Sequence, residues 1–286
     1  MKTIKYSALI IAFTLLFSGC KKDEAALTPS ELTVQYKLPQ GNHDYDPTIV
    51  SLNQRYGSFF LYKFGLLDFT YAPVYIPGGF TDTYTVDQPD EAYVGKVLTF
   101  LQNNWLNYYP DAFLKANLPF KVLMGQNLRT KATTPTYYTV LSNYNQMTVS
   151  NVSAAFDAMT AAQKKTYVNT LHTEFFNYIF NRGKLDVPAE FSTVTNYTLP
   201  GSTTLYYAQG YLSITNAFAT ENKMIKDFLS YIALITSKTK SELDATVLKS
   251  TTDTAGLIKK KYDIIINYYK TKYNIDLQAI GNAGVI

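Results

Sequence analysis

Apolar side chains recur at helical spacing in two long stretches of the chain. Residues three and four positions apart share one face of a helix, so this spacing predicts amphipathic helices. The first helix is predicted over residues 90–108, with a buried face formed by Val94, Val97, Leu98, Leu101 and Trp105. The second begins at Thr160, where Thr160 and Gln163 match a capping box, and it is expected to stop at Gly183.

Shorter patterns predict the remaining elements. Strands are predicted from apolar and aromatic runs at Tyr56–Phe64, Phe120–Met124 and Tyr137–Leu141. A cluster of breakers follows the first strand, at Pro73, Pro77, Gly78 and Gly79. Further helices are predicted to start at Asp46-Pro47 and to span about 220–236, 240–249 and 254–273. Strands come first and helices afterwards, without an internal repeat, so we expect an α+β fold in a single domain.

The N-terminus has the pattern of an export signal. Lys2 and Lys5 precede the apolar run Tyr6–Phe17, which is too short for a membrane-spanning helix. The run leads into Phe17-Ser18-Gly19-Cys20, which resembles a bacterial lipobox. The resemblance implies cleavage before Cys20 and acylation of its thiol. Two or three acyl chains on one residue suffice for stable membrane anchoring.

The sequence therefore divides into three parts. Residues 1–19 are the predicted lipoprotein signal peptide, residues 20–29 an acylated tether, and residues 30–286 the folded domain. The tether begins with Lys21-Lys22-Asp23-Glu24. This charged run resembles the export signal that sends some lipoproteins of glycan-degrading Gram-negative bacteria to the cell surface. We expect an outer-membrane lipoprotein at the cell surface, with the periplasmic face as the alternative.

The composition limits the chemistry that the chain can perform. Its 286 residues are 47% hydrophobic and 17% charged, which suits one globular domain with a sizeable core. Only two histidines, His43 and His172, and one cysteine, Cys20, are present. A zinc site with three His or Cys ligands therefore cannot be built from this chain alone.

The charge pattern excludes another class of partner. Cleavage after residue 19 lowers the net charge from +4 to +2, because it removes Lys2 and Lys5. The basic residues are scattered except for Lys259-Lys260-Lys261, which falls in a predicted helix and is expected to be a solvated face. No basic stripe indicates binding to nucleic acid.

One stretch of the predicted 160–182 helix has the frame of a metal site. Zincins carry H-E-x-x-H on a helix, because residues at i and i+4 share a face and the Glu activates a zinc-bound water. The frame here is Thr173-Glu174-Phe175-Phe176-Asn177. The Glu is present, whereas both His positions carry poor zinc ligands. By itself this window fits an ordinary amphipathic helix equally well.

Several segments together carry a family resemblance. The chain resembles the substrate-import-associated zinc metallohydrolase lipoproteins, also called putative zinc-binding metallopeptidases, found beside TonB-dependent uptake systems. The likeness covers roughly residues 50–240 and rests on Arg55–Phe64 (RYGSFFLYKF), Asp68-Phe69, Thr170-Leu171-His172, Pro188–Phe191 (PAEF), Gly210–Ser213 (GYLS) and Lys226–Ser230 (KDFLS). It implies a zincin-like metallopeptidase fold with a small mixed sheet, and zinc as the family's cofactor.

The departures from the family pattern decide the expected function. Carried over by position, the two ligand histidines become Thr173 and Asn177. The family's E-D-F-A-E becomes K-D-F-L-S at Lys226–Ser230, so that Asp227 is the one acid of the motif that is kept. Which of those acids completes the site in active members is left open. His172 points about 100° away from Thr173 around the helix, so we expect it to be satisfied elsewhere or solvent-facing. Glu174 is then a vestigial general base, and no zinc is expected to bind.

Three functions remain open at this point. The leading hypothesis is a catalytically inactive, lipid-anchored accessory or binding protein of a TonB-dependent uptake system, with a peptide or glycan ligand. The second is a working hydrolase with an atypical site, in which Glu174 and Asp227 hold a metal through oxygen ligands. The third is a carbohydrate-binding lipoprotein, suggested by 25 Tyr and 17 Phe.

A final expectation concerns the charge that zinc would have balanced. A partly desolvated carboxylate without a counterion is unfavourable. Lys226 stands where the family usually has an acid. We therefore predict an ion pair between Lys226 and Glu174 or Asp227.

Overall fold

The computed structural model describes residues 36–285 apart from 66, 72 and 78. Leu38–Ile286 form one compact unit. The predicted signal peptide, Cys20 and the tether lie outside the described residues. None of the helices in the described ranges is both long and apolar enough to cross a bilayer.

A mixed four-stranded sheet forms one half of the molecule. Its order is β1 (Phe59–Leu61), β5 (Lys121–Met124), β8 (Gln146–Val149) and β7 (Val140–Ser142). The first three strands run parallel, and β7 pairs antiparallel to β8 at the edge. Every residue of β5, β8 and β7 is buried, as expected for strands covered on both faces.

The first predicted strand is shorter than its aromatic run. Helix α2 (Asp46–Tyr56) occupies the start of that run and ends at Gly57, which adopts a left-handed conformation with φ of 73°. Glycine tolerates this conformation without steric cost, so the helix stops there and β1 begins only at Phe59. The other two predicted strands correspond to β5 and to the region of β7.

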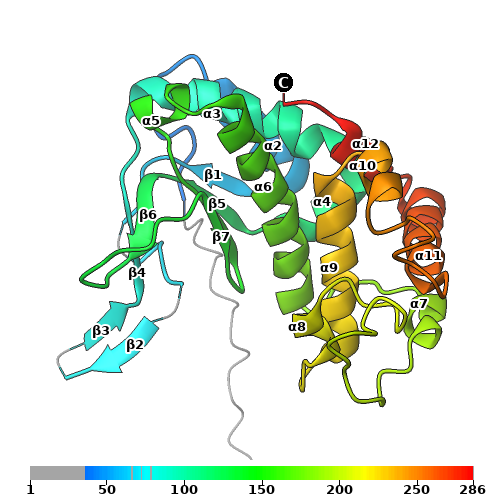
Figure 1. Cartoon of the computed structure of the whole chain (residues 1–286). Helices are drawn as coiled ribbons and strands as arrows, with labels where there is room; N and C mark the ends of the chain where they lie inside the picture. Colours follow the sequence, from blue (N-terminus) through cyan, green and yellow to red (C-terminus); the bar gives the residue numbers. More distant parts are fainter. Residues whose placement is uncertain (1–35, 66, 72, 78, 286) are drawn as a thin grey trace, which may run out of the picture. The chain divides into compact units, whose positions relative to one another are not determined.

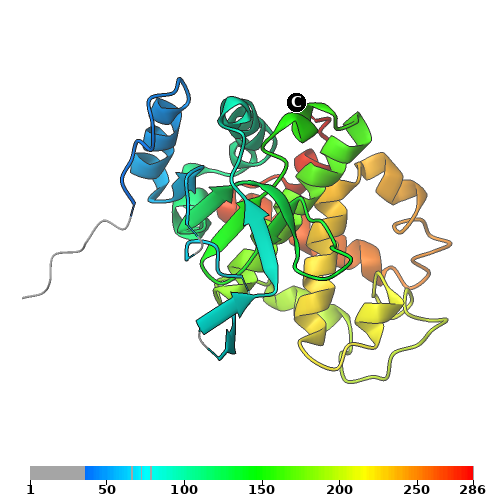
Figure 2. The same ribbon diagram turned by 90° about the vertical axis from the view of Figure 1, so that its left-hand side faces the viewer.

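The predicted interruption at residues 73–79 is instead a hairpin. Strands β2 (Pro73–Ile76) and β3 (Gly79–Asp82) pair antiparallel around it, and β4 (Tyr84–Asp87) pairs with β6 (Gln126–Thr130). Proline is accepted at the first residue of a strand, so Pro73 does not prevent pairing. Figure 1 shows the hairpin extending beyond β4, and Figure 2 shows it from the side.

Helices pack along the sheet and form the rest of the molecule. The first set is α3 (Glu91–Asn104), a 3₁₀ turn at Leu106–Tyr108, α4 (Asp111–Asn117), α5 (Ala154–Asp157) and α6 (Ala161–Asn181). The predicted capping box of α6 is present, with Thr160 and Gln163 bonding each other's backbone N–H. The predicted 90–108 helix breaks at Trp105, and only the 3₁₀ turn continues it.

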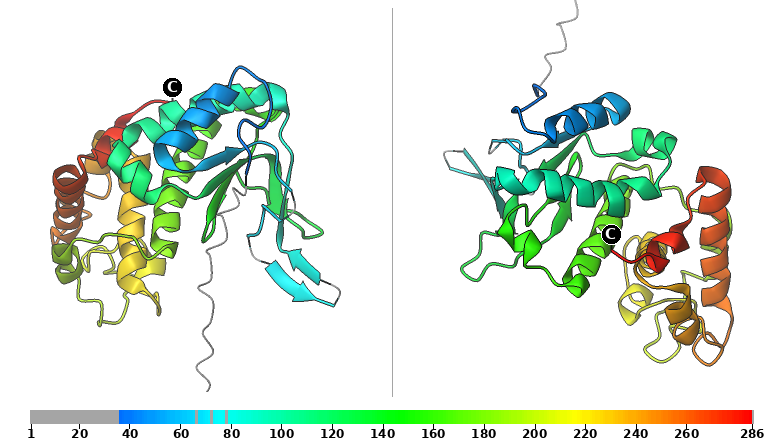
Figure 3. Two further views of the ribbon diagram at one scale, coloured as in Figure 1. Left: turned by 180° about the vertical axis from the view of Figure 1, so that it is seen from behind. Right: turned by 90° about the horizontal axis from the view of Figure 1, so that it is seen from above.

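The C-terminal part, from residue 182 on, consists of helices and the loops between them, without a strand in the described residues. It contains α7 (Ala189–Val194), α8 (Ile214–Ala217), α9 (Lys223–Ser237), α10 (Lys240–Ala245), α11 (Leu257–Tyr273) and α12 (Leu277–Asn282). Helix α9 packs against α6 and α12, and α11 packs against α7. Figures 1 and 3 show α6 between the sheet and α9, with α11 on the far side of α9. The predicted α+β class in one domain is confirmed.

Candidate functional site

Glu174, the carboxylate of the predicted metal frame, is bound to the edge of the sheet. The backbone N–H of Ser142 lies 2.9 Å and its hydroxyl 2.6 Å from Oε2 of Glu174. Asn177 donates its side-chain amide to Oε1 at 3.2 Å. Asn143, the residue that follows β7, donates its backbone N–H to the carbonyl of Gln146, so the N–H of Ser142 points to the free edge of the sheet. The carboxylate therefore caps an otherwise open strand edge.

The face of α6 that carries Thr173 looks onto α9. An open surface hollow of about 480 Å³ lies between residues of the two packed helices, and Thr173 and Ser230 both line it. The other lining residues are Thr166, Asn169, Thr170, Leu212, Ala233, Leu234 and Ser237. Position 230 of the downstream motif is thus brought opposite the first ligand position of the frame. Its side chain is a hydroxyl, not a carboxylate.

The predicted ion pair of Lys226 is not formed. Lys226 is exposed, and no acidic group in the described ranges lies within ion-pair distance of it. Asp227 is completely buried on α9, and its cation is Lys261 of α11. The prediction named Lys226 and is therefore wrong; the cation beside Asp227 comes from another helix. Lys226 follows Asn222 by one helical turn and projects to solvent, whereas Asp227, the next residue, faces the core.

Lys261 sits in a cage of aromatic rings. Its Nζ lies 4.9 Å from the ring centre of Phe191, 5.1 Å from Tyr197, 5.4 Å from Tyr211 and 5.5 Å from Tyr231. It donates to the carbonyl of Gly210 at 3.0 Å as well as to Asp227. The expectation that Lys259–Lys261 form a solvated face is therefore wrong for Lys261.

Burial disfavours the charged form of both Asp227 and Lys261. It raises the pKa of Asp227, an effect that the nearby Lys261 opposes, and it lowers the pKa of Lys261. Tyr197 donates its hydroxyl to Asp227 at 2.8 Å, whereas the other carboxylate oxygen has no partner in the described residues. Three of the sequence segments singled out above, PAEF, GYLS and KDFLS, thus meet around one buried lysine.

The two histidines have separate structural roles. His172 is fully buried; its Nε2 donates to the carbonyl of Asn104 at 3.0 Å, and its Nδ1 accepts from the hydroxyl of Tyr109 at 2.7 Å. Since a carbonyl can only accept, Nε2 carries a proton, and the lowered pKa of the ring leaves Nδ1 as the acceptor. Burial lowers the pKa of His172 to about 3. The expectation that His172 is satisfied away from the frame is met by these contacts.

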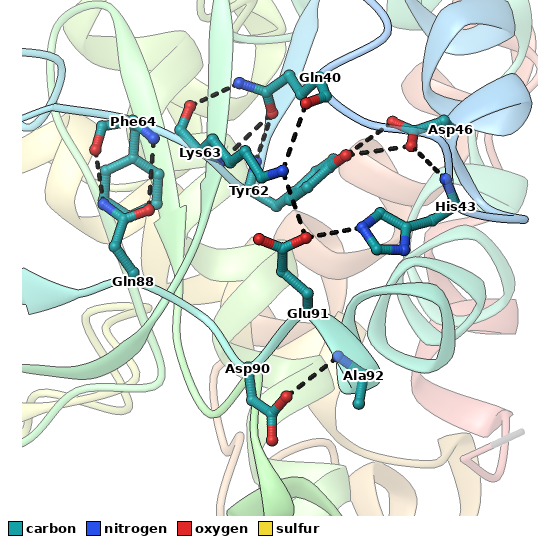
Figure 4. A network of polar contacts seen from close by, with 10 residues as sticks. All are labelled: Gln40, His43, Asp46, Tyr62, Lys63, Phe64, Gln88, Asp90, Glu91 and Ala92. Atoms are coloured by element: carbon teal, nitrogen blue, oxygen red, sulfur yellow. Dashed lines mark hydrogen bonds and ion pairs between the residues drawn. The ribbon is translucent and has the colours of Figure 1, made fainter.

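His43 lies in a different network, at the start of the described chain. Its Nε2 is 2.7 Å from Oε2 of Glu91, the first residue of α3, and Lys63 reaches the same oxygen at 3.4 Å. Gln40 and Asp46 complete the contacts between this segment and the end of β1 (Figure 4). His43 thus fastens residues 40–46 to the body of the domain.

The chain is similar to known proteins of one family. The family model described as "Putative zinc-binding metallo-peptidase" matches residues 78–278. The chain belongs to this family. A crystal structure of a protein described in the same words, from Bacteroides caccae, matches with a TM-score of 0.55 and 14% identity, covering 83% of this chain and 88% of that one. At this identity the likeness shows the fold alone. A comparison with curated proteins found no match.

The residues at the frame do not fit the zinc that the family name implies. Thr173, Asn177 and Ser230 offer hydroxyl and amide oxygens, and zinc prefers imidazole, thiolate and carboxylate ligands. No group of three or more His, Cys, Asp or Glu in the described ranges is placed to hold a metal ion. Glu174 and Asp227 do not share a site either, because each is held by its own partners.

Sequence reasoning missed two residues that define this region. Ser142 lies in an apolar strand segment, and nothing local marks it as the partner of Glu174. Lys261 belongs to a run of three lysines, although the helical pattern offers a signal: Ile258, Tyr262 and Ile265 place the apolar face of α11 beside it.

Proposed function

We propose that this protein is a catalytically inactive, zincin-like member of the family, acting as a binding or accessory component of a nutrient-uptake system. The observation that carries the proposal is the environment of Glu174. Its carboxylate accepts hydrogen bonds from Ser142 and Asn177, and the positions that flank it supply no imidazole. A general base must be free to take a proton from water, and this one is engaged in holding a strand edge.

The missing ligands remove the main source of catalysis. A metal ion in a hydrolase lowers the pKa of its bound water and stabilises developing negative charge, which together supply several kcal/mol. A lone carboxylate cannot supply that stabilisation. The alternative of a metal held through oxygens by Glu174 and Asp227 is not favoured, because Lys261 already fills the space beside Asp227.

The proposed location and partners rest on sequence resemblances. The segment ending at Cys20 resembles a lipobox, and the charged residues after it resemble a surface-export signal. The family resemblance suggests a role beside a TonB-dependent transporter in the outer membrane. In this role the protein would hold a peptide or glycan ligand at the cell surface without cleaving it.

Metal analysis combined with a cleavage assay tests the proposal. Purified protein is incubated with one equivalent of Zn²⁺, desalted, and analysed for zinc by mass spectrometry. We expect well under one equivalent to be retained and no cleavage of a mixed peptide library. The Glu174→Gln variant is the matched control, because a contaminating protease would be equally active in both samples. Stoichiometric zinc, or cleavage that disappears in the variant, would overturn the proposal.

A further inference from the structure

Glu174 and Asp227 differ in how their charge is balanced. Asp227 has the ammonium of Lys261 beside it, fully buried. Glu174 is half-buried, and its three donors, two from Ser142 and one from Asn177, are all neutral. Throughout the part of the chain that the structure describes, no Lys, Arg or His lies within 4.0 Å of Glu174. A partly desolvated carboxylate thus lacks a cation.

Three tyrosines pack together, and one of them, Tyr71, follows a residue that is hydrogen-bonded to the end of β7, where Ser142 holds this carboxylate. The ring of Tyr84 lies 4.5 Å from that of Tyr71 and 5.7 Å from that of Tyr138, both at 69°. We call them the tyrosine cluster. All three are only partly buried, so a ligand can reach them. The cluster is positioned by Asp82, whose carboxylate accepts from the backbone N–H of Tyr71 at 2.7 Å and of Tyr84 at 3.0 Å.

Hydrogen bonds hold the residue before Tyr71 to the segment that binds Glu174. Asn143 donates its side-chain amide to the carbonyl of Thr70, and its neighbour Ser142 binds Glu174. Tyr71 and Glu174 are therefore brought to the same end of β7. Consistent with this, burial and then the charge of Glu174 raise the pKa of Tyr71 to about 12.

We propose that Glu174 and the tyrosine cluster bind a cationic group of the ligand, an ammonium or a guanidinium. A carboxylate attracts the charge directly, and the faces of tyrosine rings attract cations through their quadrupole. The inference rests on the proposed function and narrows its ligand to a basic peptide. The cation can come from a lysine or arginine side chain or from a free N-terminus, and these sources share the same chemistry.

Binding measurements with matched peptides test this inference. Four pentapeptides of otherwise identical neutral sequence are titrated into the purified protein by calorimetry. One carries a central lysine with both ends blocked, the second carries Nε-acetyl-lysine, the third arginine, and the fourth a free N-terminus with a central norleucine. We expect the charged peptides to bind at least about tenfold more tightly than the acetyl-lysine peptide. Comparison of the first, third and fourth peptides distinguishes the sources of the cation.

Protein variants localise the binding. Glu174→Gln keeps the size and the acceptor oxygen of the side chain, and we expect it to weaken binding of the preferred charged peptide about tenfold. Tyr71→Leu should also weaken it. The controls are Glu190→Gln, an exposed glutamate on α7, and Tyr137→Leu, an exposed tyrosine outside the cluster; neither should change affinity. Circular dichroism verifies that each variant is folded.

The outcomes separate this inference from the proposed function. Equal affinity for charged and acetylated peptides, no binding of any peptide, or unchanged binding in folded Glu174→Gln would each refute cation recognition by this site. The proposed function is tested separately, by zinc retention and by peptide cleavage. None of these affinity results changes the outcome of those two measurements.

Discussion

Ser142 donates both its backbone N–H and its hydroxyl to one carboxylate oxygen of Glu174, at 2.9 and 2.6 Å. This contact joins α6 to the edge strand β7 at the position where the family frame places its general base. A hydrogen bond to a charged group contributes about 1.5–3 kcal/mol, so the contact stabilises the interface between helix and sheet. The same glutamate that the sequence marks as a catalytic remnant is therefore a structural residue.

Removal of the Ser142 hydroxyl tests this role. We expect Ser142→Ala to lower the free energy of unfolding by about 1.5–3 kcal/mol, since the remaining backbone N–H satisfies Glu174 only in part. Ser192→Ala is the matched control, because its exposed hydroxyl bonds only to the carbonyl of Ala189. Urea unfolding followed by circular dichroism measures both. Equal stability of Ser142→Ala and wild type would contradict the structural role of the contact.

Loss of the buried lysine should be more damaging. Lys261→Met leaves Asp227 buried without a cation, and breaking a buried ion pair costs about 3–5 kcal/mol. The double variant Lys261→Met with Asp227→Asn should recover part of this loss, because it removes the stranded charge. Lys260→Met, at an exposed neighbouring position, should change the stability by less than about 0.5 kcal/mol. A double variant no more stable than Lys261→Met alone would argue against a charged pair.

The buried histidine predicts a pH dependence. In the unfolded chain His172 takes up a proton near its usual pKa of about 6.5, whereas in the folded state burial lowers its pKa to about 3. The unfolded state therefore binds more protons between these values, and stability falls by up to roughly 1.4 kcal/mol for each pH unit on acidification. Unfolding curves from pH 7 to pH 4 should show this slope. His172→Gln should reduce this slope by about one proton.

Rebuilding the metal frame tests the inherited geometry. The triple variant Thr173→His, Asn177→His, Ser230→Glu places two imidazoles one helical turn apart, with a carboxylate across the hollow that Thr173 and Ser230 share. We expect it to retain about one equivalent of Zn²⁺ in a form that a chelator removes. The pair Thr173→His, Asn177→His without the glutamate should retain less. If the triple variant binds no more zinc than wild type, positions 173 and 230 do not face a common metal.

Membrane anchoring is tested at the N-terminus. Cys20→Ser removes the only thiol, so acylation becomes impossible and the protein should move from the membrane to the soluble fraction. Immunoblots of fractionated cells after a high-salt wash measure this shift. Continued membrane association of the variant would contradict the lipobox assignment.

The sequence determined those features that depend on local pattern. Thr160 and Gln163 fixed the start of α6 because a capping box needs only two residues at the right spacing. Helical spacing also fixed α3, α9 and α11, and the frame at Thr173–Asn177 revealed the missing histidines. The sequence did not predict the β2–β3 hairpin, because its strands are short and their pairing depends on the turn rather than on hydrophobic alternation.

Tertiary structure alone decided which side chains meet. Ser142 and Glu174 are 32 residues apart, and Asp227 and Lys261 are 34 apart, so no window of sequence contains either pair. Lys226 and Lys261 look alike in sequence, yet one projects into water and the other is caged by four rings. The difference arises because packing of α9 against α11 buries one face of each helix, and a charge on that face must find its partner inside.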